Sequence, residues 1–227
     1  MHTRDGRRSL IGLPDFCLVE RGLMHFEEAL KLQLALHSEV RSGRIKGALI
    51  LLEHYPVITL GAGARPENLL ATEDELRASD IELVRTDRGG DVTYHGPGQL
   101  VGYPIVDLRA IRSDVHRFLR LIESTIISAV ADFGVAAGRK GPAGVWVGER
   151  KLCSIGIAVR GGVTYHGFAL NVNPNLNHFG FINPCGLKSE QITSLDRLVA
   201  PPPDMSAVRD RVTKYFHRYI LEAERPE

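Results

Sequence analysis

Cys185 is the side chain in this sequence best suited to covalent chemistry. It lies in Asn183-Pro184-Cys185-Gly186, where a proline and a glycine hold the thiol in a turn and leave its flank open. A free cysteine is most often a small buried apolar residue, but loops commonly carry function. A thiol with a pKa of about 8.5 is only a few per cent thiolate at neutral pH. A reactive Cys185 therefore needs a cationic neighbour or a base.

Lys151 is the best candidate for that neighbour. It stands in G-E-R-K-L-C-S-I-G-I, where strand alternation puts four residues on one face: Lys151, Cys153, Ile155 and Ile157. If this face lies on the core side, burial lowers the pKa of the lysine and makes it usable as a base. The open alternative is a hairpin lysine in solvent, like Arg150 beside it.

Cys153 is a rival nucleophile, because two residues along one strand face place it roughly 7 Å from Lys151. A strand interior is nevertheless a poor place for a group that must meet a bulky substrate. Cys17 follows Phe16 with no expected partner, and we assign it to packing.

A glycine-rich run at residues 88–99 reads R-G-G-D-V-T-Y-H-G-P-G-Q, between two apolar segments. Glycine permits positive φ and close approach of a ligand to the backbone. We interpret the run as a wall of a binding site, with a long hairpin turn as the open alternative. It is neither a P-loop nor a GxGxxG opening a helix, so phosphate binding is poorly supported.

The glycine-rich run has an internal echo. Residues 88–96 resemble residues 160–167, R-G-G-V-T-Y-H-G, apart from the inserted Asp91. The echo is either coincidence in two strand passages, or a sign that two similar strands line one cavity from two sides. His95 and His166 hold the same place in it. Either could act as a base to a cysteine, or serve as a hydrogen-bonded structural histidine.

The composition is that of a soluble globular protein with a sizeable core. Of 227 residues, 44% are hydrophobic and 24% charged, and the net charge of +1 gives no field that favours nucleic acid or a membrane. No signal peptide and no membrane-spanning run are recognisable. Three cysteines fit a reducing cytoplasm, and scattered histidines without CxxC or HExxH disfavour a metal site. We expect a cytoplasmic monomer without nucleic-acid or membrane partners.

The elements expected around these residues follow from hydrophobic periodicity. It predicts helices at 22–41, 72–78, 113–133 and 205–224, with Thr72 and Glu75 forming a capping box and Ser113 capping the third helix. Strands are predicted at 48–60, in two pieces bent at Pro56, and at 81–86, 100–108 and within 145–172, where G-E-R-K closes a hairpin. We predict an α/β (α+β) fold, a single domain with a mixed β-sheet flanked by helices.

Five motifs together resemble the octanoyltransferases of lipoate biosynthesis, also called lipoyl(octanoyl) transferases or lipoate-protein ligase B. They are R-G-G-D-V-T-Y-H-G-P-G-Q-L-V-x-Y-P-I, G-P-A-G-V-W-V-G-x-x-K-L, G-F-A-L-N-V, N-P-C-G and I-T-S-L, in the family's order, where x marks a position that does not carry the resemblance. The resemblance runs from Val19 to Leu198. Residues 19–227 would then be the catalytic domain and residues 1–18 an N-terminal tail and lead-in, of which we expect the first eight to be disordered.

The resemblance implies a fold related to biotin and lipoate protein ligases. It also implies transfer of an octanoyl group from octanoyl-acyl carrier protein to a lysine of lipoyl domains. Those domains belong to 2-oxoacid dehydrogenase E2 subunits and the glycine cleavage H protein. No cofactor is implied, neither ATP nor a metal.

The same resemblance implies roles for particular residues. Cys185 matches the acyl-thioester cysteine, and Lys151 matches the lysine that lowers its pKa or acts as its base. At Cys153 the family usually has a small residue such as alanine. The substrate-binding positions match Arg88, Gly89, Gly90, Asp91, Val92, Thr93, Tyr94, His95, Ser154, Ile155, Gly156, Gly167, Phe168 and Ala169.

Burial of about six methylenes of an octanoyl tail is worth ~5 kcal/mol. We expect Gly89, Gly90 and Gly156 to leave room for such a chain, so that larger side chains there shorten the preferred acyl group. Two alternatives stay open. One is an ATP-dependent lipoate or biotin ligase, which needs no cysteine nucleophile. The other is a non-catalytic module that binds acyl carrier protein or lipoyl domains.

Overall fold

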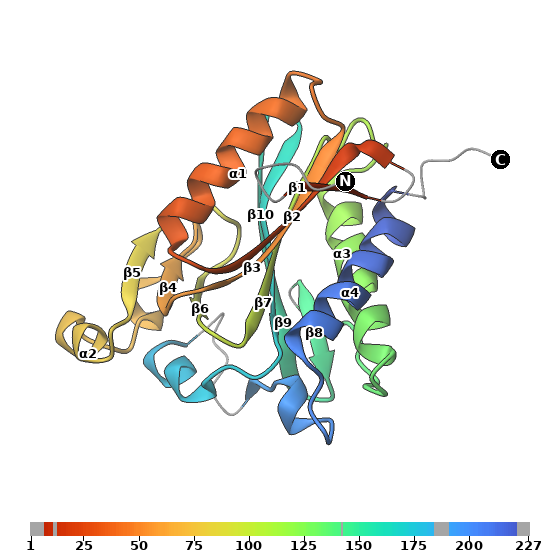
Figure 1. Ribbon diagram of the computed structural model, residues 1–227. Coiled ribbons are helices and arrows are strands. Elements are labelled where there is room, and N and C mark those ends of the chain that lie inside the picture. Colours follow the sequence, from red (N-terminus) through yellow and green to blue (C-terminus); the bar gives the residue numbers. More distant parts are fainter. Residues whose placement is uncertain (1–6, 11–12, 142, 184–190, 222–227) are drawn as a thin grey trace.

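The computed structural model describes residues 7–10, 13–141, 143–183 and 191–221. Within these ranges, a large mixed sheet forms the centre of the molecule (Figure 1). Its strand order is β1-β2-β3-β7-β10-β9-β8. The strands are β1 (Arg7–Leu10), β2 (Leu13–Met24), β3 (Gly47–His54), β7 (Gln99–Val106), β8 (Gly144–Val147), β9 (Arg150–Arg160) and β10 (Val163–Asn171). Only β2 and β3 pair in parallel, and helix α1 (Phe26–Arg41) is their crossover.

A second, three-stranded sheet lies beside the large one, in the order β5-β4-β6. It consists of β4 (Val57–Leu60), β5 (Glu82–Arg85) and β6 (Val92–His95). Strands β4 and β5 are parallel and are joined through η1 (Pro66–Asn68) and α2 (Glu73–Ala78). The sequence predicted one sheet. The bend at Pro56 instead separates β3 and β4 into different sheets.

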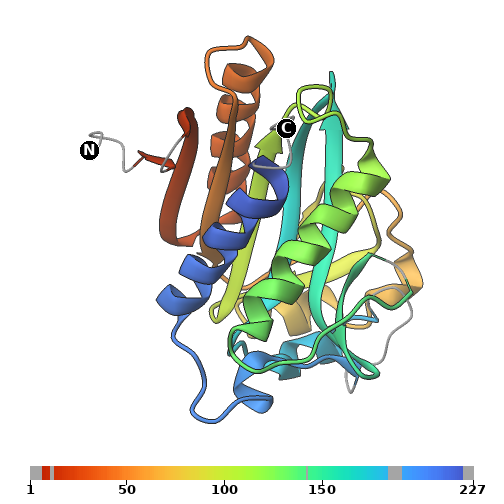
Figure 2. The same cartoon turned by 90° about the vertical axis from the view of Figure 1, so that its right-hand side faces the viewer.

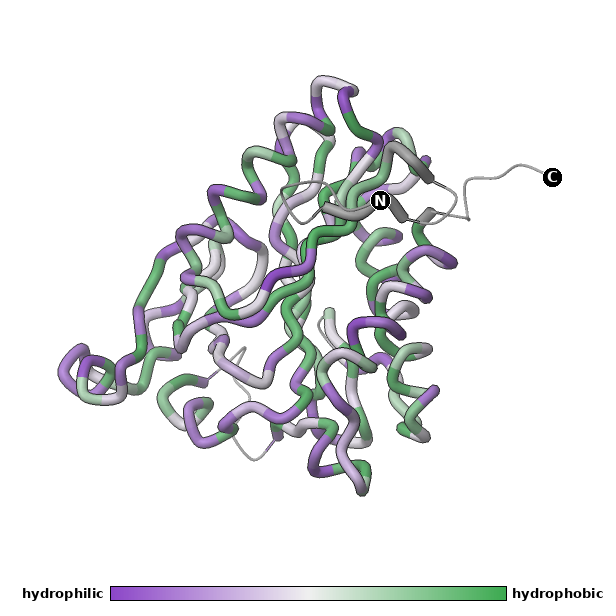
Figure 3. The backbone as a smooth tube through the Cα atoms, in the orientation of Figure 1, coloured by the Kyte–Doolittle hydropathy of each residue, from purple (hydrophilic) through white to green (hydrophobic). Residues whose placement is uncertain are grey.

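Helices cover both faces of the large sheet. Helix α1 packs on one face, and α3 (Val115–Ala131) and α4 (Met205–Phe216) cover the other (Figures 1 and 2). Strand β3 shows why: Leu49 and Leu51 join the core under α3 and α4, whereas Ile50 and Leu52 join the core under α1. A strand buried on both faces reads as a continuous apolar run. In Figure 3 the central strands are mostly hydrophobic, whereas hydrophobic and hydrophilic residues alternate along the helices.

Helix boundaries follow local capping chemistry. The capping box of Thr72 and Glu75 at α2 is confirmed. Helix α3 is capped by Asp114, whose carboxylate accepts a hydrogen bond from the N–H of Arg117, so the expectation of Ser113 was wrong. Helix α1 begins at Phe26 rather than residue 22, because the chain from Leu13 to Met24 is strand β2. The last helix continues from α4 as a π-helical turn, His217–Leu221.

Two further expectations change. The glycine-rich run contains a strand, β6, at Val92–His95, which pairs with β4 rather than turning as a plain hairpin. The expected boundary at residue 19 falls inside β2, and Arg7 and Arg8 pair with Val19 and Leu18 in the sheet, so these two residues are not a disordered tail. The β8–β9 hairpin is confirmed. None of the helices in the described ranges is long and apolar enough to cross a membrane.

Candidate active site

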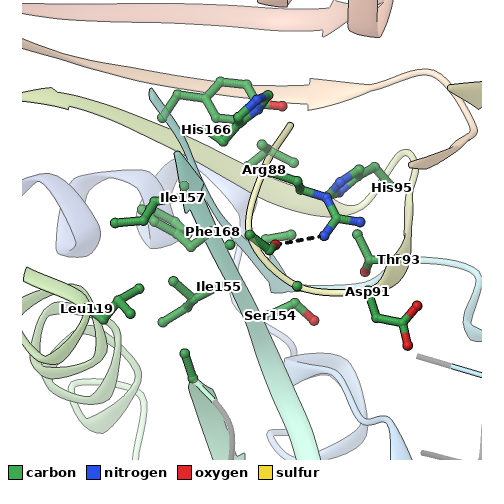
Figure 4. Close-up of a pocket in the computed structure, with 18 of the residues that line it drawn as sticks. Arg88, Asp91, Thr93, His95, Leu119, Ser154, Ile155, Ile157, His166 and Phe168 are labelled. Carbon is green, nitrogen blue, oxygen red and sulfur yellow. Dashed lines mark hydrogen bonds between the residues drawn. The ribbon is translucent and has the colours of Figure 1, made fainter. Parts of the chain in front are cut away.

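A cavity of about 280 Å³ lies between β9, β10, the loop that leads into β6, and the first turns of α3. Figure 4 shows Leu119, Ile155 and Ile157 on one side of it, and Arg88, Thr93 and His95 on the other. Lys151 also lines it, so one cavity joins an apolar wall to polar and charged groups. Of the sequence-predicted residues it is lined by Arg88, Gly89, Gly90, Asp91, Val92, Thr93, His95, Lys151, Ser154, Ile155, Gly156, Gly167, Phe168 and Ala169.

Both echoed segments reach this cavity, one through residues 88–93 and 95 and the other through His166 and Gly167, which Phe168 and Ala169 follow along the lining. Tyr94 does not line it. Successive strand side chains point to opposite faces, and the hydroxyl of Tyr94 lies 2.7 Å from Nδ1 of His178 on the other face of β6.

The loop before β6 is fixed against strand β9. The N–H of Gly89 donates to the carbonyl of Ile157 at 2.9 Å. A Cβ atom on Gly156 would lie 2.5 Å from the carbonyl oxygen of Gly89. The role of Gly156 is therefore close approach of two backbones, not room for a chain. Gly90 has φ +90°, so a side chain there strains the backbone whatever the space.

Arg88 holds the polar side of the cavity in place. Its guanidinium is buried, and it donates to the hydroxyl and carbonyl oxygens of Thr59 and to the carbonyl of Gly89. Because this buried, planar guanidinium donates several hydrogen bonds, the Arg88 side chain is held in one orientation. Arg88 thus joins the small sheet to the loop that forms the cavity wall.

The carboxylate of Asp91 is also occupied by hydrogen bonds from within the protein. Its Oδ1 accepts from the N–H groups of Arg65 at 3.1 Å and Val92 at 2.8 Å, and its Oδ2 accepts from the side-chain amide of Asn68. The carbonyl of Asn68 in turn accepts from the N–H of Asn183 at 2.8 Å. Asp91, the one residue inserted in the echo, therefore ties the cavity wall to the chain two residues before Cys185.

The two echoed histidines have different surroundings. His95 is buried beside Gln99 and His54, and burial together with the charge environment of His54 and Arg88 holds the pKa of His95 well below its usual range. His54 contacts the hydroxyl of Tyr103 at 2.6 Å, and burial lowers the pKa of His54 to about 4. Both rings are neutral at neutral pH.

His166 has φ +55°, a conformation rare for a residue with a side chain. Its Nε2 lies 3.0 Å from Oδ1 of Asp87, and burial lowers its pKa although Asp87 opposes this. In the β9–β10 ladder His166 stands opposite Ile157, six residues from Lys151. Six strand residues span roughly 20 Å. A base working beside Lys151 is therefore not His166.

Lys151 is buried, with 6% of the residue exposed. Its Nζ lies 5.6 Å from the ring centroid of Trp146 on the neighbouring strand. A cation over an indole face is favourable, so Trp146 helps to fix the lysine. The alternative of a solvent-exposed hairpin lysine does not hold.

Cys153 is fully buried in the core under α3 and α4, and burial raises the pKa of its thiol. A protonated thiol without solvent access is a poor nucleophile. Cys185 lies outside the described residues. Lys151 is thus the described member of the expected pair.

The cavity is also lined by residues that the sequence did not single out as site residues: Phe26, Val101, Tyr103, Val115, Leu119 and Ala143. Ile157, expected on the strand face of Lys151, and His166, the second echoed histidine, line it as well. Val115 and Leu119 belong to the apolar stripe of α3, which in the sequence is indistinguishable from ordinary core. Among the residues described, no group of three or more His, Cys, Asp or Glu side chains could hold a metal ion.

Solved structures place the fold in one class. Lipoate-protein ligase A bound with ATP superposes with a TM-score of 0.71 at 17% identity, over 91% of this chain and 85% of the other. Biotin protein ligase from Aquifex aeolicus in complex with biotin and ATP gives a TM-score of 0.54 at 10% identity, over 91% and 71%. The chain therefore has the mixed α/β fold of lipoate and biotin protein ligases, as the sequence predicted.

The chain belongs to the lipoyl protein ligase A/B catalytic domain family, which matches residues 25–217. The octanoyltransferase of Geotalea uraniireducens (strain Rf4) is 47% identical to it over 206 residues, which cover 90% of this chain and 93% of that protein. The resemblance read from the motifs is confirmed.

Proposed function

We propose that this chain is an octanoyltransferase that moves an octanoyl group from octanoyl-acyl carrier protein to a specific lysine of lipoyl domains. The observation that carries the proposal is the cavity that joins buried Lys151 to an apolar wall, in a chain 47% identical to an octanoyltransferase. The acceptors proposed are the lipoyl domains of 2-oxoacid dehydrogenase E2 subunits and the glycine cleavage H protein. The proposed location is the cytoplasm.

The first step is a thioester exchange. Lys151 takes the proton of Cys185 or stabilises its thiolate, and the sulfur attacks the octanoyl carbonyl. The bond from carbon to the carrier sulfur breaks, the carrier leaves with a thiol once it takes up a proton, and the octanoyl group is a thioester on Cys185. Because one thioester replaces another, the step needs no ATP.

The second step is aminolysis. The acceptor lysine is normally protonated, with a pKa of about 10.4, and must lose a proton before it attacks. The new amide bond forms as the bond to Cys185 breaks, and the thiol is regenerated. An amide is more stable than a thioester, so the step is downhill. Because His166 stands far along the ladder from Lys151, the candidates for the proton acceptor are Lys151 and the neutral His95, both of which line the cavity.

Mass spectrometry of the enzyme incubated with octanoyl-acyl carrier protein tests the proposal. The expected result is one octanoyl adduct on the peptide that contains Cys185, discharged when a lipoyl domain is added. A Cys185→Ala variant should form no adduct and transfer nothing. Full activity in that variant would end the proposal.

The same assay decides between the alternatives. An ATP-dependent lipoate or biotin ligase would transfer nothing from the acyl carrier protein and would need ATP with a free acid. A non-catalytic binding module would bind its partner without adduct or product. We expect transfer without ATP and without added metal.

A further inference from the structure

Glu123 is a buried carboxylate close to Lys151 that the proposed mechanism does not use. It belongs to α3, and 1% of its side chain is exposed. Its Oε2 accepts hydrogen bonds from Nη1 of Arg120 at 2.7 Å and Nε of Arg139 at 2.9 Å. Its Oε1 accepts from the backbone N–H of Gly144 at 3.2 Å. A buried charge is costly unless it is paired and hydrogen-bonded, so these contacts hold Glu123 in one place.

Gly144 is the residue through which Glu123 reaches the lysine. A Cβ atom on Gly144 would lie 2.7 Å from Cε of Lys151 and 3.5 Å from its Nζ. The lysine side chain therefore runs directly over the Cα of Gly144. With φ +152°, Gly144 also has a backbone conformation that side chains rarely adopt.

The strand that carries Gly144 is not fixed by ladder pairing alone. The register between β8 and β9 shifts between Val145 and Trp146. Gly144 and Trp146, which stand on either side of this irregularity, both contact Lys151. The hydrogen bond from the N–H of Gly144 to Glu123 joins the start of β8 to α3. It therefore helps to fix the position of Gly144, where the pairing of β8 with β9 is irregular.

The charges of Lys151 and Glu123 both act on the neighbouring thiol of Cys153. Burial is the main cause of the raised pKa of the Cys153 thiol, and beside it Lys151 lowers and Glu123 raises that pKa, so both charges lie within electrostatic reach of the thiol. Arg120 and Arg139, which are 59% and 43% exposed, offset the charge of Glu123. We therefore expect the position of Gly144, rather than the net charge, to transmit the effect.

We propose that Glu123 is a positioning residue for Lys151, acting through the hydrogen bond to Gly144 that fixes the start of β8 beneath the lysine side chain. The proposal rests on the proposed function, in which Lys151 acts on the thiol of Cys185.

The test compares Glu123→Met, which keeps volume but has no acceptor, with Glu123→Gln, which keeps an oxygen for Gly144. Iodoacetamide alkylation of Cys185 is followed from pH 5 to pH 10 by peptide mass spectrometry, which separates it from Cys17 and Cys153. Glu149→Gln is the control, because Glu149 lies in the same hairpin but is exposed and pairs with Lys140. Circular dichroism reports the folded fraction, and Glu123→Ala replaces Glu123→Met if the latter does not fold.

In Glu123→Met we expect the midpoint of alkylation to move up by about one pH unit, and the rate at pH 7 to fall about tenfold. Glu123→Gln and Glu149→Gln should stay within about threefold of the parent at the parent midpoint. A purely structural role would scale the whole profile by the folded fraction without moving its midpoint, and would overturn the inference. An equal shift in Glu123→Gln would also overturn it, because the charge would then act directly.

A Lys151→Met variant separates this inference from the function on which it rests. A midpoint unchanged in Lys151→Met removes Lys151 from the mechanism, and the proposed role of Glu123 falls with it. A midpoint that moves in Lys151→Met but not in the folded Glu123→Met variant overturns the role of Glu123 alone.

Discussion

Lys151 and Cys153 stand two residues apart on β9, yet the fold gives them different environments. Lys151 lines the cavity beside Trp146, whereas Cys153 is enclosed in the core with a raised thiol pKa. Strand alternation places both on one face, so the sequence argued against Cys153 as a nucleophile only because a strand interior is a poor place to meet a bulky substrate. Lys151 can meet a substrate because it lines the cavity, and Cys153 cannot because it is packed in the core.

We predict that Cys153→Ala keeps octanoyl transfer within about twofold of the parent, with a loss of stability of about 1 kcal/mol for the removed sulfur. The reason is that the buried, protonated thiol takes no part in the reaction. Transfer rates with equal folded protein are the measurement. Alkylation at pH 7 should label Cys185 and spare Cys153 in the native protein. A tenfold loss of transfer would identify Cys153 as functional.

We predict that Leu119 on α3, which lines the apolar side of the cavity, selects the length of the acyl chain, rather than Gly90, whose substitution would strain the backbone. Leu119→Phe should fill the apolar side of the cavity and lower the ratio of octanoyl to hexanoyl transfer by about tenfold, since one or two methylenes are worth that much in a fitted pocket. Competition between the two donors measures the ratio. Leu34→Phe, at an exposed position on α1, is the control. Equal ratios in the two variants would show that the acyl chain does not bind beside Leu119.

At the scale of elements, the small sheet and η1 act as a clamp on the cavity wall. Arg88 ties the loop to β4, and Asp91 ties it to η1 through Arg65 and Asn68. Asn68 then holds Asn183, two residues before Cys185. The carboxylate of Asp91 in this motif thus holds the fold together, while Arg88, Thr93 and His95 line the cavity.

Asp91→Ala should lower the free energy of unfolding by about 3 kcal/mol, because it leaves three donors without their acceptor. It should also slow acylation of Cys185 in the folded fraction. Thr72→Ala serves for comparison: losing the cap of α2 should cost about 1 kcal/mol and leave acylation unchanged. Urea denaturation and adduct formation are the two measurements. Acylation equally fast in both variants would show that the clamp does not reach the thiol.

At the scale of the whole molecule, the cavity is bordered by a buried cluster of neutral histidines. His54 and His95 have ring centroids 5.7 Å apart, and Phe26 stacks on His166 at 6.3 Å. All three histidines have lowered pKa values because burial disfavours the charged ring. His54 lies on β3 and His166 on β10 of the large sheet, and His95 lies on β6 of the small sheet. Protonation of the cluster would therefore place charge in the contact between the two sheets.

We predict that acid weakens this joint. The unfolded chain binds protons at histidine below a pH of about 6.5, while folded His54 resists until about pH 4, so stability is lost as pH falls through that window. For His54 alone the difference corresponds to roughly 3 kcal/mol. Urea unfolding from pH 7.5 to pH 4.5 measures it, and His54→Gln should flatten the slope. His116→Gln, at an exposed position, should not. A slope unchanged in His54→Gln would contradict the assignment.

The sequence by itself determined the existence of the helices, the capping box of α2 and the hairpin that carries Lys151, because periodicity, caps and turns depend on residues close in the chain. The family, and with it most of the residues that line the cavity, came from the resemblance of its motifs to octanoyltransferases. Only the tertiary structure decided that Pro56 divides two sheets, that His166 lies far from Lys151, and that Asp91 and Glu123 serve the fold around the cavity. Those outcomes depend on which distant backbone groups meet, and residue types alone do not specify that pairing.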